Sequence, residues 1–149
     1  SDSVSVCFFD NDTEKEENWM KTIIAGSRTV GRLGTRSWNY DHLVDLVRQA
    51  VVESGFKITA VISGGAGGPD RAGEIWAEAT ETPMEQFKPN WRLGKGAGIK
   101  RNSDMVARAD AIIALYDGKS KGTLDTIEKM KRAGKKDFVL NVASSSKQE

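Results

Sequence analysis

Short apolar runs alternate with helix-like segments along most of the chain, and this alternation constrains the fold more than any other feature. Five runs have the length of buried strands, at residues 22–25, 58–62, 84–87, 111–115 and 138–142. Between them, apolar residues recur at helical spacing over residues 40–54, 69–80, 98–109 and 124–133. We therefore predict an α/β fold, a doubly wound sheet of about five mostly parallel strands with helices on both faces.

Three turns rich in glycine or polar residues follow the first, second and fourth predicted strands. Their sequences are Gly26-Ser27-Arg28, Ser63-Gly64-Gly65-Ala66-Gly67-Gly68 and Gly118-Lys119-Ser120-Lys121-Gly122-Thr123. A turn of this kind before a helix directs backbone N–H groups at an anion, of which phosphate is the usual one. With the strand order 3-2-1-4-5, the three turns would be neighbours at the edge where doubly wound sheets bind ligands. A tight turn without a ligand is the alternative.

Polar side chains near these turns are candidates for the same site. The hydroxyl and amide groups of residues 120–123 could bind phosphate, and Lys121 adds charge unless it is simply solvated. Arg28 has no apolar neighbour to cover, so we expect it to pair with a phosphate, with Asp70 or with Asp117. Asp70 lies in the first turn of a predicted helix, where it either caps that helix or accepts a hydrogen bond from a ribose or a base.

Composition narrows the function classes. With 22 basic and 21 acidic residues, the net charge of +1 gives no electrostatic argument for nucleic-acid or membrane binding. A single histidine and a single cysteine rule out a His/Cys zinc cluster, and we predict neither a metal site nor a cofactor. The chain has no apolar run long enough for a transmembrane helix and no secretory signal, and we expect a cytoplasmic protein.

Composition also divides the chain. Residues 1–19 form an N-terminal extension, in which 4–9 could be a short strand and 10–17 is acidic and polar. This extension could be disordered, an added strand or a contact to a partner. Residues 20–142 hold the predicted domain, and residues 143–149 form a polar C-terminal tail.

Four motifs resemble the YspA/YpsA-related SLOG domains. They are Lys21-Thr22-Ile23-Ile24-Ala25-Gly26-Ser27-Arg28, residues 61–70, Arg101-Asn102 with Met105, and residues 117–123. The resemblance covers roughly residues 20–142. It implies a Rossmann-like domain that binds a nucleotide or a nucleotide-derived ligand, and a homodimer or higher homo-oligomer as its assembly.

One branch of that superfamily, the LOG-type phosphoribohydrolases, releases a base from a nucleoside monophosphate. Its R-x-x-x-M signature matches Arg101 to Met105, but G-G-x-G-T-x-x-E matches only in part, because Thr126 stands where the branch has its catalytic glutamate. Asp125 and Glu128 are near in sequence but about 100° and 200° away around a helix. Asp70 and Asp125 therefore remain weak candidates for a catalytic carboxylate.

Three hypotheses on function follow. The first is a nucleotide-binding domain for sensing or sequestration, the second is a nucleotide-processing enzyme such as an N-glycosidic hydrolase, and the third is an interaction protein that keeps the fold without a ligand. Under the first, the expected binding residues are Gly26, Ser27, Arg28, Ser63, Gly64, Gly65, Ala66, Gly67, Asp70, Arg101, Asn102, Asp117, Ser120, Lys121, Gly122 and Thr123.

Overall fold

A parallel five-stranded sheet forms the centre of the molecule in the computed structural model, which describes residues 19–142. Its strands stand in the order β5 (Met84–Gln86), β4 (Lys57–Ser63), β1 (Trp19–Gly26), β6 (Ala111–Tyr116) and β7 (Lys136–Asn141). Every neighbouring pair runs parallel. The predicted α/β fold is confirmed, and the strands stand in the order under which the three turns were expected to be neighbours, so the chain reverses its direction of winding at β1.

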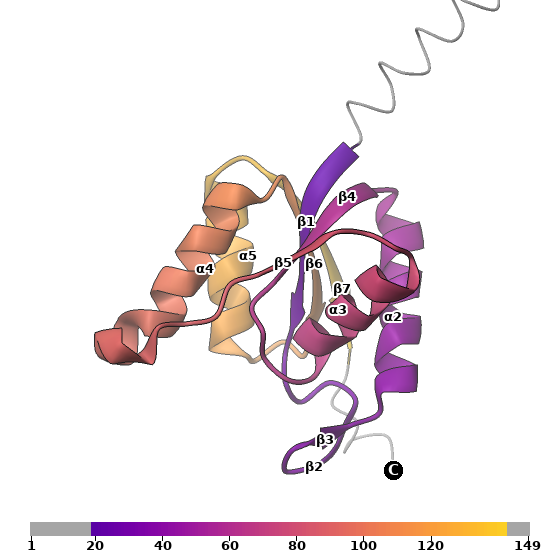
Figure 1. The fold of residues 1–149 in the computed structure, drawn as a ribbon, viewed down its shortest axis with the longest axis horizontal. Helices are drawn as coiled ribbons and strands as arrows, with labels where there is room; N and C mark the ends of the chain where they lie inside the picture. The colour runs from indigo at the N-terminus through magenta and orange to yellow at the C-terminus, as the bar shows by residue number, and fades with distance from the viewer. Residues whose placement is uncertain (1–18, 143–149) are drawn as a thin grey trace, which may run out of the picture.

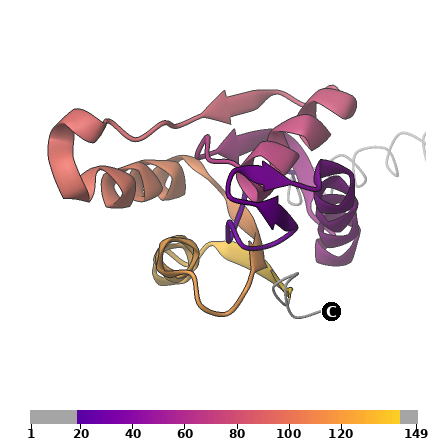
Figure 2. The same ribbon diagram turned by 90° about the horizontal axis from the view of Figure 1, so that it is seen from below.

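Two helices cover each face of the sheet. Helices α2 (Tyr40–Ser54) and α3 (Pro69–Ala79) lie on one side, and α4 (Ala97–Arg108) and α5 (Lys121–Arg132) lie on the other (Figures 1 and 2). This arrangement is the doubly wound layering expected from alternating strands and helices. None of the helices within residues 19–142 is long and apolar enough to cross a membrane.

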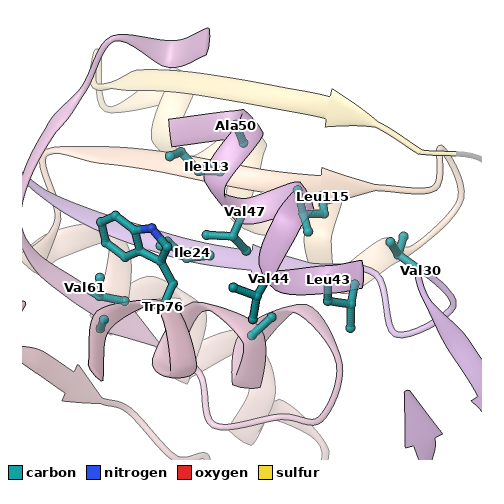
Figure 3. Packing of buried hydrophobic residues seen from close by; sticks show 12 residues of the cluster. Ile24, Val30, Leu43, Val44, Val47, Ala50, Val61, Trp76, Ile113 and Leu115 are labelled. Carbon is teal, nitrogen blue, oxygen red and sulfur yellow. The ribbon is translucent and has the colours of Figure 1, made fainter. Parts of the chain in front are cut away.

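The core is divided by the sheet into two clusters because successive strand side chains point to opposite faces. In β1, Ile24 joins the cluster under α2 and α3, with Leu43, Val47 and Trp76 (Figure 3). Its neighbour Ile23 joins the cluster under α4 and α5. Both isoleucines are fully buried, so β1 contributes to the core on both sides.

A close approach of three segments positions the carboxyl edge of the sheet. A side chain at Gly26 would place its Cβ 2.5 Å from the Leu115 carbonyl oxygen and 2.7 Å from Pro69 Cβ. Only glycine therefore lets the end of β1 lie against both β6 and the start of α3. The amide of Ser27 donates to the Leu115 carbonyl at 2.9 Å and continues the contact beyond the strand.

Three short elements were not predicted, and several element boundaries differ from the prediction, most of all the starts of β1 and α5, which each lie three residues earlier. A hairpin of β2 (Arg32–Gly34) and β3 (Ser37–Trp38) and a 3₁₀ segment, η1 (Trp91–Gly96), were not predicted. Helix α5 begins at Lys121 rather than at residue 124, because Ser120 caps it through its side chain. Apart from residue 19, the expected extension lies outside the described residues, as does the tail 143–149.

Candidate functional site

A cavity of about 610 Å³ lies at the carboxyl edge of the sheet, where the segments after β1, β4, β5 and β6 meet helix α4. All three predicted turns contribute to it. The predicted site residues that line it are Gly26, Arg28, Gly64, Gly65, Ala66, Gly67, Asp70, Arg101, Asn102, Ser120, Gly122 and Thr123. The structure thus brings these residues together around one cavity, and their role in binding a ligand remains a prediction.

Four predicted residues do not line the cavity: Ser27, Ser63, Asp117 and Lys121. Six further residues line it without having been named as binding residues, and these are Ala25, Lys88, Pro89, Trp91, Met105 and Thr126. The family signature had pointed to Met105 and to position 126. Trp91 stood out only as a tryptophan in a loop, and nothing in the sequence singled out Lys88 or Pro89.

Asp117 ties two of the turns together instead of facing the cavity. Its carboxylate accepts hydrogen bonds from the hydroxyls of Ser27 at 3.0 Å and Thr29 at 2.6 Å, and from the amides of Lys119 and Ser120 at 2.8 and 2.9 Å. Partial burial alone would raise the pKa of Asp117, but these four bonds outweigh it and lower the pKa to about 2. The side chain is therefore ionised at neutral pH and holds the turn after β1 against the turn after β6.

Ser63 supports the second turn from below. It is fully buried, donates its hydroxyl to Glu74 at 2.6 Å and accepts the amide of Gly65 at 3.1 Å. Burial alone would raise the pKa of Glu74, but hydrogen bonds from Ser63, Gln86 and Arg71 outweigh it and lower the pKa below its usual value. The glycine-rich turn thus rests on a satisfied polar network.

Asp70 and Arg101 meet at Gly64. The Arg101 guanidinium donates to the Gly64 carbonyl at 2.5 Å, and a Cβ on Gly64 would lie 2.7 Å from Arg101 Nη1 and 2.9 Å from Asp70 Oδ2. Burial raises the pKa of Asp70 to about 6, although the Ala66 amide and the charge of Arg101 both oppose the shift. Asp70 therefore does not act as a simple helix cap, because its carboxylate accepts from the turn that precedes α3.

The hairpin braces the same turn from the outside. Side chains at Gly67 and Gly68 would lie 2.7 and 2.9 Å from the Trp38 ring, so the indole packs directly on the glycine backbone. The Tyr40 hydroxyl accepts the Gly68 amide at 3.1 Å. Trp38 also donates its indole N–H to the Arg28 carbonyl at 2.8 Å, which links the hairpin to the first turn.

The start of helix α5 lines the cavity through Ser120, Gly122 and Thr123. The amides of Lys121 and Gly122 stand at the first two helical positions, where no partner exists within the helix. Asn102 holds this end against α4 by donating to Asp125 at 3.1 Å. Asp125 also pairs with Lys129 at 2.7 Å and does not line the cavity, whereas Thr126 does.

Positive charge gathers around the cavity in spite of the nearly neutral chain. Arg28, Lys88 and Arg101 line it, against the single carboxylate of Asp70. The side chains of Arg28 and Lys88 make no ion pair or hydrogen bond within residues 19–142, while Arg101 donates only to uncharged acceptors. Within the described part of the chain, no group of three histidine, cysteine or acidic residues is placed to hold a metal ion.

Comparisons with known proteins support the fold. No protein-family model matches the chain, and no curated protein matches it. Among solved structures, the chain is similar to the X-ray structure of DNA processing protein A (DprA) from Streptococcus pneumoniae, with a TM-score of 0.59 and 16% sequence identity. The match covers 83% of this chain and 51% of that one, so the chain spans about half the length of this structural neighbour. The likeness supports the Rossmann-like α/β fold.

Proposed function

We propose that residues 20–142 form a YspA/YpsA-related SLOG domain that binds a nucleotide or a nucleotide-derived small molecule, for sensing or sequestration. The observation that carries the proposal is the meeting of three turns around one cavity. Arg28, whose guanidinium has no partner within residues 19–142, lines this cavity together with Gly122 and Thr123 of α5. A homo-oligomer and a cytoplasmic location belong to the same proposal.

Phosphate chemistry suits the side of the cavity formed by β1 and β6. Arg28 stands between Ser27 and Thr29, and both of these bind Asp117, which in turn anchors the turn before α5. A phosphate there would receive the fork of a guanidinium and the free amides of a helix N-terminus together. Charge-assisted hydrogen bonds of this type contribute roughly 1.5–3 kcal/mol each.

Calorimetric titration of the protein with nucleoside 5′-monophosphates tests this proposal. We expect Arg28→Ala to weaken binding about tenfold or more, since it removes a charged donor. Arg48→Ala is the matched control, because Arg48 lies on α2 and pairs only with the exposed Asp45. A ligand at 100 times its Kd should also stabilise the fold by about 2.7 kcal/mol.

A short single-stranded oligonucleotide belongs in the same titration, because the structural neighbour carries a DNA-processing name. The net charge of +1 leads us to expect weaker binding of the oligonucleotide than of a mononucleotide. Absence of binding by every mononucleotide, or tighter binding of the oligonucleotide, would contradict the proposal.

A second candidate function, hydrolysis of the N-glycosidic bond, rests on Asp70. This carboxyl group lines the cavity, and its pKa of about 6 lets it hold or release a proton near neutral pH. Thr126 faces the cavity at the position of the family glutamate and has no acidic group, and Asp125 does not line the cavity. Base release from a nucleoside monophosphate that Asp70→Asn abolishes, while binding persists, would favour the enzyme.

A further inference from the structure

Trp91 combines two properties that packing does not explain. Its side chain is 70% exposed, and it nevertheless lines the cavity. It opens η1, where the Asn90 side chain accepts the amide of Arg92 at 3.2 Å and caps the segment. A mostly exposed indole contributes little to the core, so its place at the cavity calls for another role.

The cavity has two chemically different ends. Lys88, Pro89 and Trp91 follow β5, and Lys88 contacts Gly65, since a Cβ on this glycine would lie 3.3 Å from Lys88 Cγ. Arg28 follows β1, next to the turn after β6. From β5 to β1 there are two strand spacings, or about 10 Å. Each end carries a cation, Lys88 at one and Arg28 at the other, but the aromatic side chain stands at the Lys88 end and the turn before α5 stands near the Arg28 end.

We propose that the base of the nucleotide stacks on the Trp91 indole, while its phosphate lies at the Arg28 end. This inference rests on the proposed function. It adds the orientation of the nucleotide in the cavity and names the side chain that binds the base. Stacking is tolerant of base identity because every base presents a π-face. The site therefore accepts purine and pyrimidine nucleotides alike and discriminates between them weakly.

A protein-contact surface is the competing role for Trp91. Leu93 and Ile99 are 60% and 59% exposed close to it in sequence, but neither lines the cavity. Trp91 differs from both in facing the cavity beside Lys88. Leu93 is therefore a matched control, since it is a large exposed apolar residue on the same 3₁₀ segment.

The test compares four nucleoside 5′-monophosphates, AMP, GMP, CMP and UMP, with ribose 5-phosphate, which has no base. We expect Trp91→Ala to lower the affinity for all four nucleotides about tenfold and to change the affinity for ribose 5-phosphate by less than about twofold. Trp91→Phe should retain most of the affinity, and Leu93→Ala should change nothing. Arg28→Ala should weaken nucleotides and ribose 5-phosphate alike.

Tryptophan fluorescence gives a second readout. Stacking of a base should quench the emission of the wild-type protein, and Trp91→Phe should remove the part of that quenching that comes from Trp91 while the protein still binds AMP. Unchanged affinity in Trp91→Ala for all four nucleotides, or equal weakening of ribose 5-phosphate, would overturn the stacking proposal and leave the proposed function standing. If no nucleotide binds the wild-type protein, both proposals fall.

Discussion

Asp70 is a buried carboxyl group whose ionisation weakens the fold. Its pKa is about 6 in the folded protein, against 3.8 for the same group in solvent. The folded state therefore binds the Asp70 proton more tightly than the unfolded state does. The stability that this proton contributes is fully present below pH 3.8 and is lost as the pH rises through 6. The free energy of unfolding of the wild type should fall as Asp70 ionises, and that of Asp70→Asn should not. We predict that the difference between the two, Asp70→Asn minus wild type, increases by about 2 kcal/mol from pH 4.5 to pH 7.5. Urea unfolding at both pH values measures the gain.

Asp45→Asn serves as the control for this prediction. Asp45 is an exposed aspartate on α2 that pairs only with Arg48 at the surface. Its variant should follow the pH dependence of the wild type, because an exposed pair contributes little to stability. A stability difference between Asp70→Asn and the wild type that stays constant with pH would show that the Asp70 proton is not held by burial.

At the scale of single residues, the sequence indicated which residues lie near the cavity better than it indicated what each of them contacts. Gly64, Gly65 and Arg28 lie at the cavity as expected, because a turn after a buried strand has a fixed place in a doubly wound sheet. Ser27 and Asp117 were expected at a ligand but bind each other across 90 residues. Local sequence holds no information on such a pairing, since it depends on which strands become neighbours.

Tyr40, the first residue of α2, acts on the pocket without lining it. Its hydroxyl accepts the Gly68 amide, at a glycine whose φ of 81° few other residues adopt. Tyr40→Phe removes this acceptor, and we predict a stability loss of about 1 kcal/mol together with weaker nucleotide binding. Chemical denaturation and calorimetric titration measure the two effects.

Tyr116→Phe is the matched control, because Tyr116 is the other of the two tyrosines. Within residues 19–142 the Tyr116 hydroxyl has no hydrogen-bond partner, so its removal should leave both stability and binding unchanged. Equal effects of the two substitutions would show that the Gly68 contact does not position the turn.

At the scale of elements, periodicity sufficed for the long segments and failed for the short ones. All five sheet strands followed from the alternation of apolar runs and helices, whereas their order entered only as the condition under which the three turns are neighbours. Strands β2 and β3 have only three and two residues, which is too short for any alternation to show. The start of α5 was placed three residues late because Gly122 interrupts the helical pattern after the Ser120 cap.

At the scale of the whole molecule, the two apolar clusters pack on opposite faces of one sheet. We therefore expect the helical layers on the two faces to unfold together. Leu43 is fully buried on the side of α2, and Met130 is fully buried on the side of α5. We predict that Leu43→Ala and Met130→Ala each cost about 2–5 kcal/mol. Each variant should keep a single unfolding transition, followed by both circular dichroism and tryptophan fluorescence.

A surface truncation at Val52 is the control, since this valine is 79% exposed and should change stability by less than about 0.5 kcal/mol. Two separate transitions in either core variant would mean that one helical layer detaches while the other stays folded. The sequence predicted this two-sided core through the strand and helix alternation, but it could not predict which charges of a nearly neutral chain gather on one side.

Asp117 preorganises one half of the pocket, formed by the turns after β1 and β6. Its four hydrogen bonds hold the turns after β1 and β6 together, so the phosphate that we propose there would meet donors already in place and would lose no affinity to the ordering of these turns. The opposite half, from Lys88 to Gly98, contains the kink at Gly94 and no fully buried side chain except Ala97. We therefore expect natural variants of this protein to change ligand preference through substitutions after β5, and to keep the Asp117 half unchanged.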